Sequence, residues 1–154
     1  MPFPASRITV LGSGTSVGVP AIGCHCDVCS SSDPRDQRLR PSILVSYADR
    51  NVLIDTTPDF RTQALRARIE HLDAVLFTHS HADHLMGLDD VRPFNFRQKG
   101  QIPIYASENT MAAIHRCSRH SVVSRSRTRC GPWARWCSGM SVTGSAGNAR
   151  FCCR

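Results

Sequence analysis

Short apolar runs separated by polar segments fill the first three quarters of the chain. Two of them, residues 42–47 and 51–54, flank the triplet Ala48-Asp49-Arg50, which is the pattern of a β-hairpin. The other runs of strand length lie at residues 7–11, 74–77 and 102–105. Each run is short and rich in aliphatic residues, so all five are predicted to be strands.

Helix start signals lie between these strands. In Thr57-Pro58-Asp59 the threonine is a predicted N-cap, the proline suits the first helical position, and the aspartate favours the positive end of the helix dipole. This helix is expected to run to about residue 70, and Ser107 is expected to cap a second helix over residues 108–115. Strands that alternate with helices predict an α/β protein.

The composition changes abruptly after residue 115. Residues 116–154 contain eight arginines, five cysteines and both tryptophans, but no Leu, Ile, Lys, Asp, Glu, Gln or Tyr. Because so few aliphatic side chains cannot offset the entropy of ordering, one interpretation is a disordered basic tail. Our preferred interpretation is an aberrant tail, translated from a shifted reading frame of GC-rich coding sequence. The predicted organisation is one folded part over residues 1–115 and a tail over 116–154.

The positive charge of the protein belongs to this tail. The formal net charge is +7, but residues 1–115 hold 11 of the 19 basic side chains and all 12 acidic ones, a net of −1. A nucleic-acid surface needs a basic patch on the folded part. Nucleic acid is therefore not an expected partner.

The chain is predicted to be soluble and cytoplasmic, and this affects how its cysteines are interpreted. The first ten residues lack the apolar core of a secretory signal, and no apolar run reaches membrane-spanning length. Three of the eight cysteines cluster as Cys24-x-Cys26-x-x-Cys29. Without a secretory signal, such clusters are typical of metal ligands rather than of disulfides. We therefore predict one structural zinc ion at these cysteines, the alternative being free thiols in a loop.

The segment His79-Ser80-His81-Ala82-Asp83-His84 carries the strongest chemical signal in the sequence. Residues two apart in an extended loop point to the same side, so His79 and His81 can hold one metal ion together. The chain is then expected to turn into a helix near His84, which presents Asp83 and His84 to a second ion. Imidazole and carboxylate ligands suit zinc, manganese or iron.

The glycine-rich loop at residues 12–18 does not fit two common nucleotide-binding motifs. The dinucleotide fingerprint would need glycine at position 17, where the chain has Val17, and a P-loop would need a lysine, whereas the only lysine is Lys99. We expect a tight turn beneath the metal site instead.

These motifs together resemble the metallo-β-lactamase superfamily. The pattern H-x-H-x-D-H follows an apolar strand, and Asp55 ends an earlier one. The segment at residues 11–20, the cysteine cluster and the segments at 38–42, 57–61 and 87–92 are further similar to the phosphoribosyl cyclic phosphodiesterase branch, known from bacterial phosphonate breakdown. The resemblance covers about residues 6–115.

The resemblance implies a fold and a set of metal ligands. The implied fold is an αββα sandwich, here only its N-terminal half. His79 and His81 would bind the first of two divalent ions, zinc or manganese, and Asp83 and His84 the second. The branch completes its structural zinc site and its dinuclear site with histidines and a bridging aspartate from later in the chain, and no residue here is assigned to those roles. Asp55 is expected to orient a ligand histidine, whereas Asp89 and Asp90 remain open between a functional role and helix capping.

The implied activity is metal-dependent hydrolysis of a small cyclic phosphodiester, with Asp83 as the catalytic carboxylate. We expect the chain as printed to be impaired, because two ligands per ion hold metal weakly. An alternative within the superfamily is a transfer-RNA-processing endonuclease. An alternative of another class is a non-catalytic, zinc-binding truncated product. The sequence leaves the oligomeric state unknown.

Overall fold

A computed structural model gives the structure of the protein, and it describes residues 5–117. The five strands are β1 (Ser6–Gly12), β2 (Ser42–Tyr47), β3 (Arg50–Ile54), β4 (Ala74–Leu76) and β5 (Ile104–Tyr105). The helices are α1 (Phe60–Arg66), α2 (Ala82–Leu85), α3 (Arg92–Gln98) and α4 (Glu108–Cys117), with short 3₁₀ turns η1 (Pro34–Asp36) and η2 (Leu88–Val91). The α/β class predicted from the sequence is confirmed. The predicted tail over 116–154 lies almost entirely outside the described residues.

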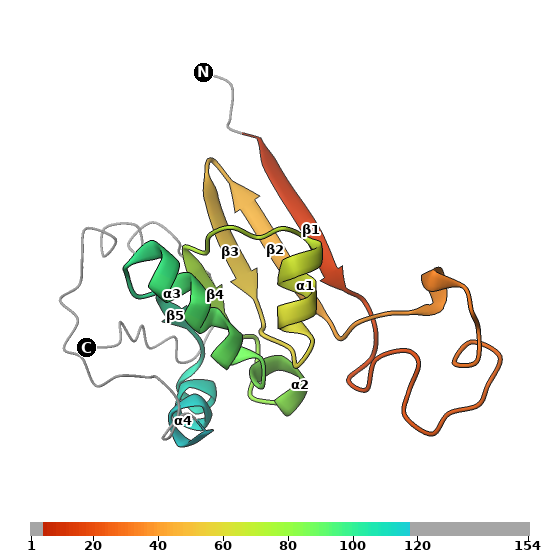
Figure 1. The fold of residues 1–154 in the computed structure, drawn as a ribbon. Helices are drawn as coiled ribbons and strands as arrows, with labels where there is room; N and C mark the ends of the chain where they lie inside the picture. The colour runs from red at the N-terminus through yellow and green to blue at the C-terminus, as the bar shows by residue number, and fades with distance from the viewer. Residues whose placement is uncertain (1–4, 118–154) are drawn as a thin grey trace.

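The strands form one sheet in the order β1-β2-β3-β4-β5 (Figure 1). The first three strands are antiparallel, and β4 and β5 continue the sheet parallel to β3. Between β2 and β3 the chain turns on Ala48 and Asp49, whose φ angles of 43° and 53° are both positive. Two consecutive residues of positive φ are typical of the type I′ turn that fits the twist of a hairpin. The predicted hairpin is thus confirmed, with β3 starting one residue earlier.

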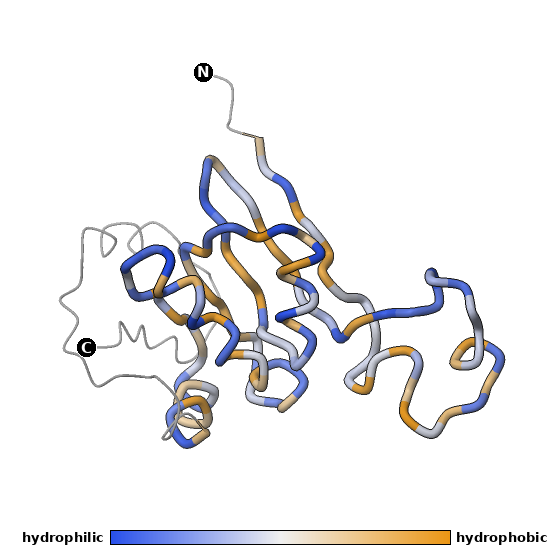
Figure 2. The backbone as a smooth tube through the Cα atoms, in the orientation of Figure 1, coloured by the Kyte–Doolittle hydropathy of each residue, from blue (hydrophilic) through white to orange (hydrophobic). Residues whose placement is uncertain are grey.

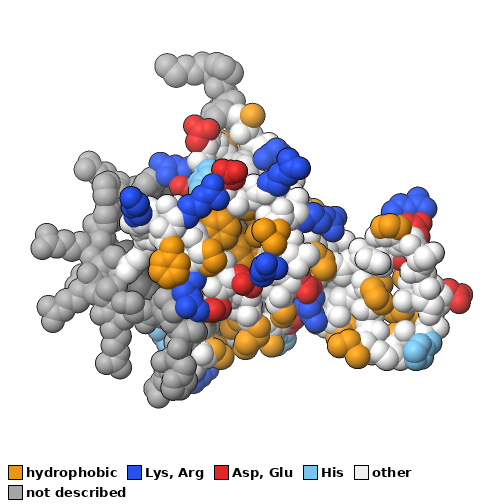
Figure 3. Space-filling view, in the orientation of Figure 1, with side chains coloured by type: hydrophobic (Ala, Val, Ile, Leu, Met, Phe, Trp, Pro, Cys, Tyr) orange, Lys and Arg blue, Asp and Glu red, His pale blue; other side chains and the backbone are white. Residues whose placement is uncertain are grey.

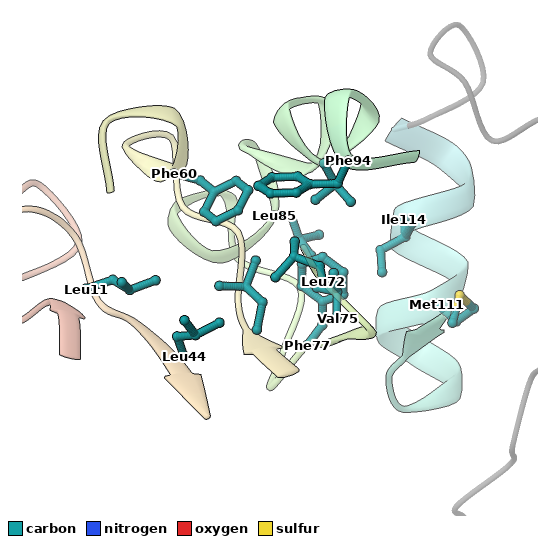
Figure 4. Close-up of a cluster of buried hydrophobic side chains, with 12 residues drawn as sticks. Leu11, Leu44, Phe60, Leu72, Val75, Phe77, Leu85, Phe94, Met111 and Ile114 are labelled. Atoms are coloured by element: carbon teal, nitrogen blue, oxygen red, sulfur yellow. The ribbon is translucent and has the colours of Figure 1, made fainter. Parts of the chain in front are cut away.

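The helices cover one face of the sheet and enclose the core (Figure 4). Phe60 of α1 packs against Phe94 of α3 with ring centroids 6.2 Å apart, and α4 contributes Met111 and Ile114. Leu53 of the central strand β3 is fully buried beneath them. One sheet with helices on one side corresponds to two of the four layers of an αββα sandwich.

The opposite face of the sheet is apolar and partly exposed. Residues paired across neighbouring strands point to the same side, and two such rows cross the sheet on this face. They are Ile8-Val45-Val52-Ala74 and Val10-Ile43-Ile54-Leu76-Tyr105. Ile8 is 69% exposed and Val10 61%. The hydropathy-coloured trace shows that apolar residues are frequent along the strands (Figure 2).

The first predicted helix differs from the observed α1 at both ends. It starts at Phe60 rather than at residue 58, because the Thr57 hydroxyl accepts the Asp59 amide at 3.1 Å and holds a turn before the helix. It ends at Arg66 rather than near residue 70, because Arg68 adopts a left-handed conformation with a φ of 51°. The amide of Ile69 then donates to the Ala64 carbonyl at 3.0 Å, which closes the helix as a Schellman motif.

The segment between β1 and β2 extends away from the sheet as an arm (Figure 1). It is tied at its base by the antiparallel bridge between Val19 and Arg38. The Gly14 amide also donates to the Leu39 carbonyl at 2.8 Å. A Cβ on Gly12 would lie 2.0 Å from the Arg40 carbonyl oxygen, so only glycine permits this approach. The expected turn is present, since the Gly18 amide donates to Thr15, but the contacts of the loop are with residues 38–40.

Candidate metal centre

The candidate ligands lie where two parallel strands end. Asp55 directly follows β3, and the loop of residues 77–81 follows β4 before α2 begins at Ala82. Because the carboxyl ends of parallel strands meet at one edge of a sheet, the two segments come together there. The helix starts two residues earlier than expected, so Asp83 and His84 both lie in its first turn.

His79, His81, Asp83 and His84 form two pairs of donor atoms. The Nε2 atom of His79 lies 3.1 Å from Nδ1 of His81, and Nε2 of His84 lies 3.3 Å from Oδ2 of Asp83. Two ligand atoms on one tetrahedral zinc ion, each at about 2.1 Å from it, are about 3.4 Å apart. Both pairs therefore have the spacing of shared ligands. The His79 and His84 rings are adjacent, with centroids 4.0 Å apart.

The Asp55 carboxylate accepts hydrogen bonds from two residues of the histidine segment, Thr78 and His84. Its side chain is 6% exposed, and its Oδ2 atom accepts hydrogen bonds from Nδ1 of His84 at 2.8 Å and from the Thr78 hydroxyl at 2.7 Å. Its Oδ1 atom accepts the Thr78 amide at 2.9 Å. The carboxylate thus contacts a candidate ligand histidine through the nitrogen that points away from Asp83, as expected from the sequence.

Asp55 holds an unusual backbone conformation that its neighbours stabilise. Its φ of 62° lies in the left-handed region, which a residue with a side chain occupies at a cost of about 1 kcal/mol or more. The buried Ser42 hydroxyl donates to the Asp55 carbonyl at 2.9 Å, and the Asp55 amide donates to the Leu76 carbonyl at 2.9 Å. This conformation turns the carboxylate from the strand end toward the histidine loop.

The next residues fasten α2 to the end of β3. The Thr56 amide donates to the His84 carbonyl at 2.8 Å, and the Gly87 amide donates to the Thr56 carbonyl at 3.0 Å. Gly87 approaches so closely that a Cβ there would lie 2.0 Å from the Thr57 carbonyl oxygen. The position of the His84 side chain therefore depends on this strap of residues 55–57 and on Gly87.

A second donor cluster lies in the arm. The Sγ atoms of Cys24 and Cys26 are 3.5 Å apart, and those of Cys24, Cys26 and Cys29 all lie within 4.8 Å of one another. Thiolates sharing one zinc ion are about 3.8 Å apart. Within residues 5–117 this is the one group of three His, Cys, Asp or Glu donors that meets such a spacing.

The cysteine cluster favours the thiolate form at one position. The Cys29 backbone amide, and then the Cys24 and Cys29 thiols, lower the pKa of Cys26 to about 7. The Ala21 amide lowers the pKa of Cys29, but the Cys24 thiol, burial and the Cys26 thiol together raise it above its usual value. Because metal ions bind the thiolate, the cluster is partly prepared for a thiophilic cation.

We expect Cys24→Ser and Cys26→Ser each to lower the zinc content of the purified chain by about one ion per molecule, because two thiolates hold zinc weakly. The measurement is elemental analysis after removal of free metal. Cys117→Ser is the matched control, since Cys117 is an exposed free thiol outside the cluster. Equal zinc in all four proteins would exclude the cluster as a zinc site.

The remaining acidic candidates have structural partners. Asp89 forms an ion pair with Arg92 at the start of α3, and the shortest distance, from Nη2 of Arg92 to Oδ2 of Asp89, is 2.5 Å. The Asp59 carboxylate accepts hydrogen bonds from Arg40, from its backbone amide at 2.8 Å and from its guanidinium at 2.9 Å. It makes no capping hydrogen bond to the N-terminus of α1. The Asp90 side chain makes no hydrogen bond or ion pair within residues 5–117.

Sequence reasoning missed three residues that shape the centre, namely Ser42, Thr78 and Gly87. Thr78 directly precedes the first histidine, and Gly87 lies three residues after the last one. Their proximity to the motif was the available signal. Their roles depend on contacts across the fold, which spacing along the chain does not show.

Comparison with known proteins now defines the class of this protein. The sequence profile described as "Beta-lactamase superfamily domain" matches residues 50–147, which is more than half of the chain. The chain belongs to the β-lactamase superfamily, and the metallo-β-lactamase fold predicted from the sequence is confirmed.

Three individual proteins are similar to this chain over most of its length. A solved structure of "a New Diphosphatase from the PhnP Family" is 56% identical, with a TM-score of 0.71 over 74% of this chain and 46% of that one. Zn(2+)-bound PqqB from Methylobacterium extorquens is 28% identical, with a TM-score of 0.61 over 73% of this chain and 40% of that one. A protein named "Octanoyltransferase" from Porphyromonas gingivalis is 50% identical over 109 residues, which are 70% of this chain and 22% of that protein.

The chain spans less than half the length of these relatives. Most of the octanoyltransferase lies outside the match, so its name describes a much longer protein than the matched part.

No helix within residues 5–117 is long and apolar enough to cross a membrane.

Proposed function

We propose that this chain carries the first half of a dinuclear metal centre that hydrolyses a small phosphodiester, most specifically a cyclic one. The observation that carries the proposal is the arrangement of four donor residues as two convergent pairs at the carboxyl ends of β3 and β4. The 56% identity to a PhnP-family diphosphatase supports phosphoryl chemistry, and the zinc in the PqqB structure supports a divalent cation.

The donor sets fit the expected ions. His79 and His81 would hold one ion, and Asp83 and His84 the other, through atoms whose spacing matches shared ligation. Zinc and manganese both accept imidazole and carboxylate ligands. Cys24, Cys26 and Cys29 would hold a separate structural zinc ion in the arm. Bound at the sheet edge, the two metal ions would supply Lewis acidity and offset the negative charge of the phosphate.

The residues of the chain itself would position the reacting groups. Asp55 fixes the His84 ring, and α2 presents Asp83 at its first turn. We expect the Asp83 carboxylate to accept the proton from the attacking water. Water would add to phosphorus and one phosphorus–oxygen ester bond would break. The departing ester oxygen would take the proton from Asp83, so that the product is a phosphomonoester with a freed hydroxyl group and the Asp83 carboxylate is regenerated.

The test is hydrolysis of bis(p-nitrophenyl) phosphate with added manganese or zinc. We expect at most slow turnover by the 154-residue chain, because residues 5–117 would give each ion only two protein ligands instead of the usual three. A longer protein, read in the alternative frame after codon 116, should turn over and should lose activity with His81→Ala. Preference of that protein for a thioester or lactone would contradict the proposed substrate class. Equal turnover by both proteins would contradict the incomplete-site prediction.

The charge distribution favours a small substrate over RNA. On the helix-covered face, basic and acidic side chains are interspersed rather than gathered by sign (Figure 3). A nuclease surface would need a basic track. A cytoplasmic location stays a prediction from the sequence.

A further inference from the structure

We propose that Thr78 is a positioning residue that fixes which nitrogen of His79 is available to a metal ion. The inference rests on the proposed metal centre and adds a role for a residue outside the ligand set. It follows from one hydrogen-bond chain, which runs from the Asp55 carboxylate through the Thr78 hydroxyl to the His79 ring.

The direction of each hydrogen bond in this chain is determined by chemistry. An ionised carboxylate only accepts, so the Thr78 hydroxyl must donate its single hydrogen to Oδ2 of Asp55, 2.7 Å away. The hydroxyl oxygen can then only accept from Nδ1 of His79, which lies 2.9 Å from it. In the neutral ring one nitrogen carries the hydrogen and the other a lone pair. Nε2 of His79 therefore carries the lone pair that a metal ion can bind, and it is the atom that faces His81.

The same carboxylate oxygen fixes the second histidine directly. Nδ1 of His84 must donate to Oδ2 of Asp55, 2.8 Å away, which leaves Nε2 of His84 free toward Asp83. One buried carboxylate thus sets two rings of two different ion sites, one by contact and one through Thr78. The Thr78 backbone amide also donates to Oδ1 of Asp55 at 2.9 Å, which holds the residue beside the carboxylate.

Thr78→Val and Thr78→Ser separate the hydroxyl from the bulk of the side chain. Valine keeps the branched shape and removes the hydroxyl, whereas serine keeps the hydroxyl. Loss of a group that orients a ligand histidine lowers metal affinity by about 10- to 100-fold. We expect this loss for Thr78→Val and nearly unchanged affinity for Thr78→Ser. Thr62→Val, an exposed threonine on α1, is the matched control.

Two readouts on the 154-residue chain test the proposal. The first is Mn²⁺ binding followed by electron paramagnetic resonance, because manganese avoids the thiolate cluster. The second is the ring ¹⁵N spectrum of the metal-free protein, at a pH where His79 is neutral. The wild type and Thr78→Ser should carry the His79 hydrogen on Nδ1, and Thr78→Val should show a population with the hydrogen on Nε2.

The outcomes separate this inference from the proposed function. Identical His79 spectra in the wild type and Thr78→Val would overturn the role of Thr78, as would equal loss in the serine and valine variants. Failure of the wild type to bind Mn²⁺ would count against the metal centre, while the metal-free spectra would still decide the role of Thr78. Circular dichroism of each variant confirms that the fold is retained.

Discussion

Replacing Gly87 with alanine should destabilise the protein by about 3 kcal/mol or more and should abolish metal binding at the sheet edge. The added methyl group would lie 2.0 Å from the Thr57 carbonyl oxygen and 3.0 Å from Cβ of Phe60. The obstacle at 2.0 Å is backbone, so it cannot be relieved by rotation of a side chain. Either α2 or the strap of residues 55–57 must move, and each movement separates His84 from Asp55.

Chemical denaturation followed by circular dichroism measures the loss of stability, and Mn²⁺ titration measures the loss of binding. Gly100→Ala is the matched control, because a Cβ there would meet nothing closer than 3.7 Å and should change stability by only about 0.5 kcal/mol. Wild-type stability in the Gly87 variant would mean that the close approach to Thr57 is not maintained in solution.

Lysine at Ile8 or Val10 should raise the solubility of the chain strongly. Both side chains lie on the apolar face of the sheet, where they are 69% and 61% exposed. An apolar surface of this kind drives association, and burial of such a side chain contributes about 1 to 2 kcal/mol. Replacing one of these apolar side chains should therefore weaken self-association by roughly tenfold, and replacing both should weaken it by roughly 100-fold.

The measurement is the soluble fraction against protein concentration, combined with light scattering. Leu65→Lys is the matched control, since Leu65 is 64% exposed but lies on α1 on the other side of the sheet. Improvement of equal size with Leu65→Lys would show that added charge, rather than the sheet face, governs solubility. A monodisperse wild type at high concentration would show that this face does not associate.

The sequence was most informative where one local pattern determines structure. All five strands lie at predicted positions because each is an aliphatic run bounded by polar residues. Ser107 caps α4 as expected, since its hydroxyl accepts the Thr110 amide at 3.4 Å. The histidine motif was recognisable because its donors are neighbours in sequence as well as in space.

The differences arise where local signals were weak or misleading. Helix α3 was not predicted, because Phe94 and Phe96 alternate with polar residues as in a strand, although Phe94 is buried and Phe96 is 73% exposed. The sequence predicts the end of α1 about four residues too late, because Arg68 takes the left-handed position that glycine usually marks. The conformation of Asp55 depends on Ser42 and Leu76, so it follows from the assembled sheet and not from the local sequence.

The strand order has a consequence for how the protein forms during synthesis. Each strand pairs with the strand that precedes it in the chain, so no pairing has to wait for a strand that is translated later. The β2–β3 hairpin can form first, and it places Asp55 at the growing edge. When β4 joins, the histidine loop meets a carboxylate that is already in position. The residues of the candidate metal centre can therefore gather on the ribosome, in the order in which they are translated, before the chain beyond α4 has emerged.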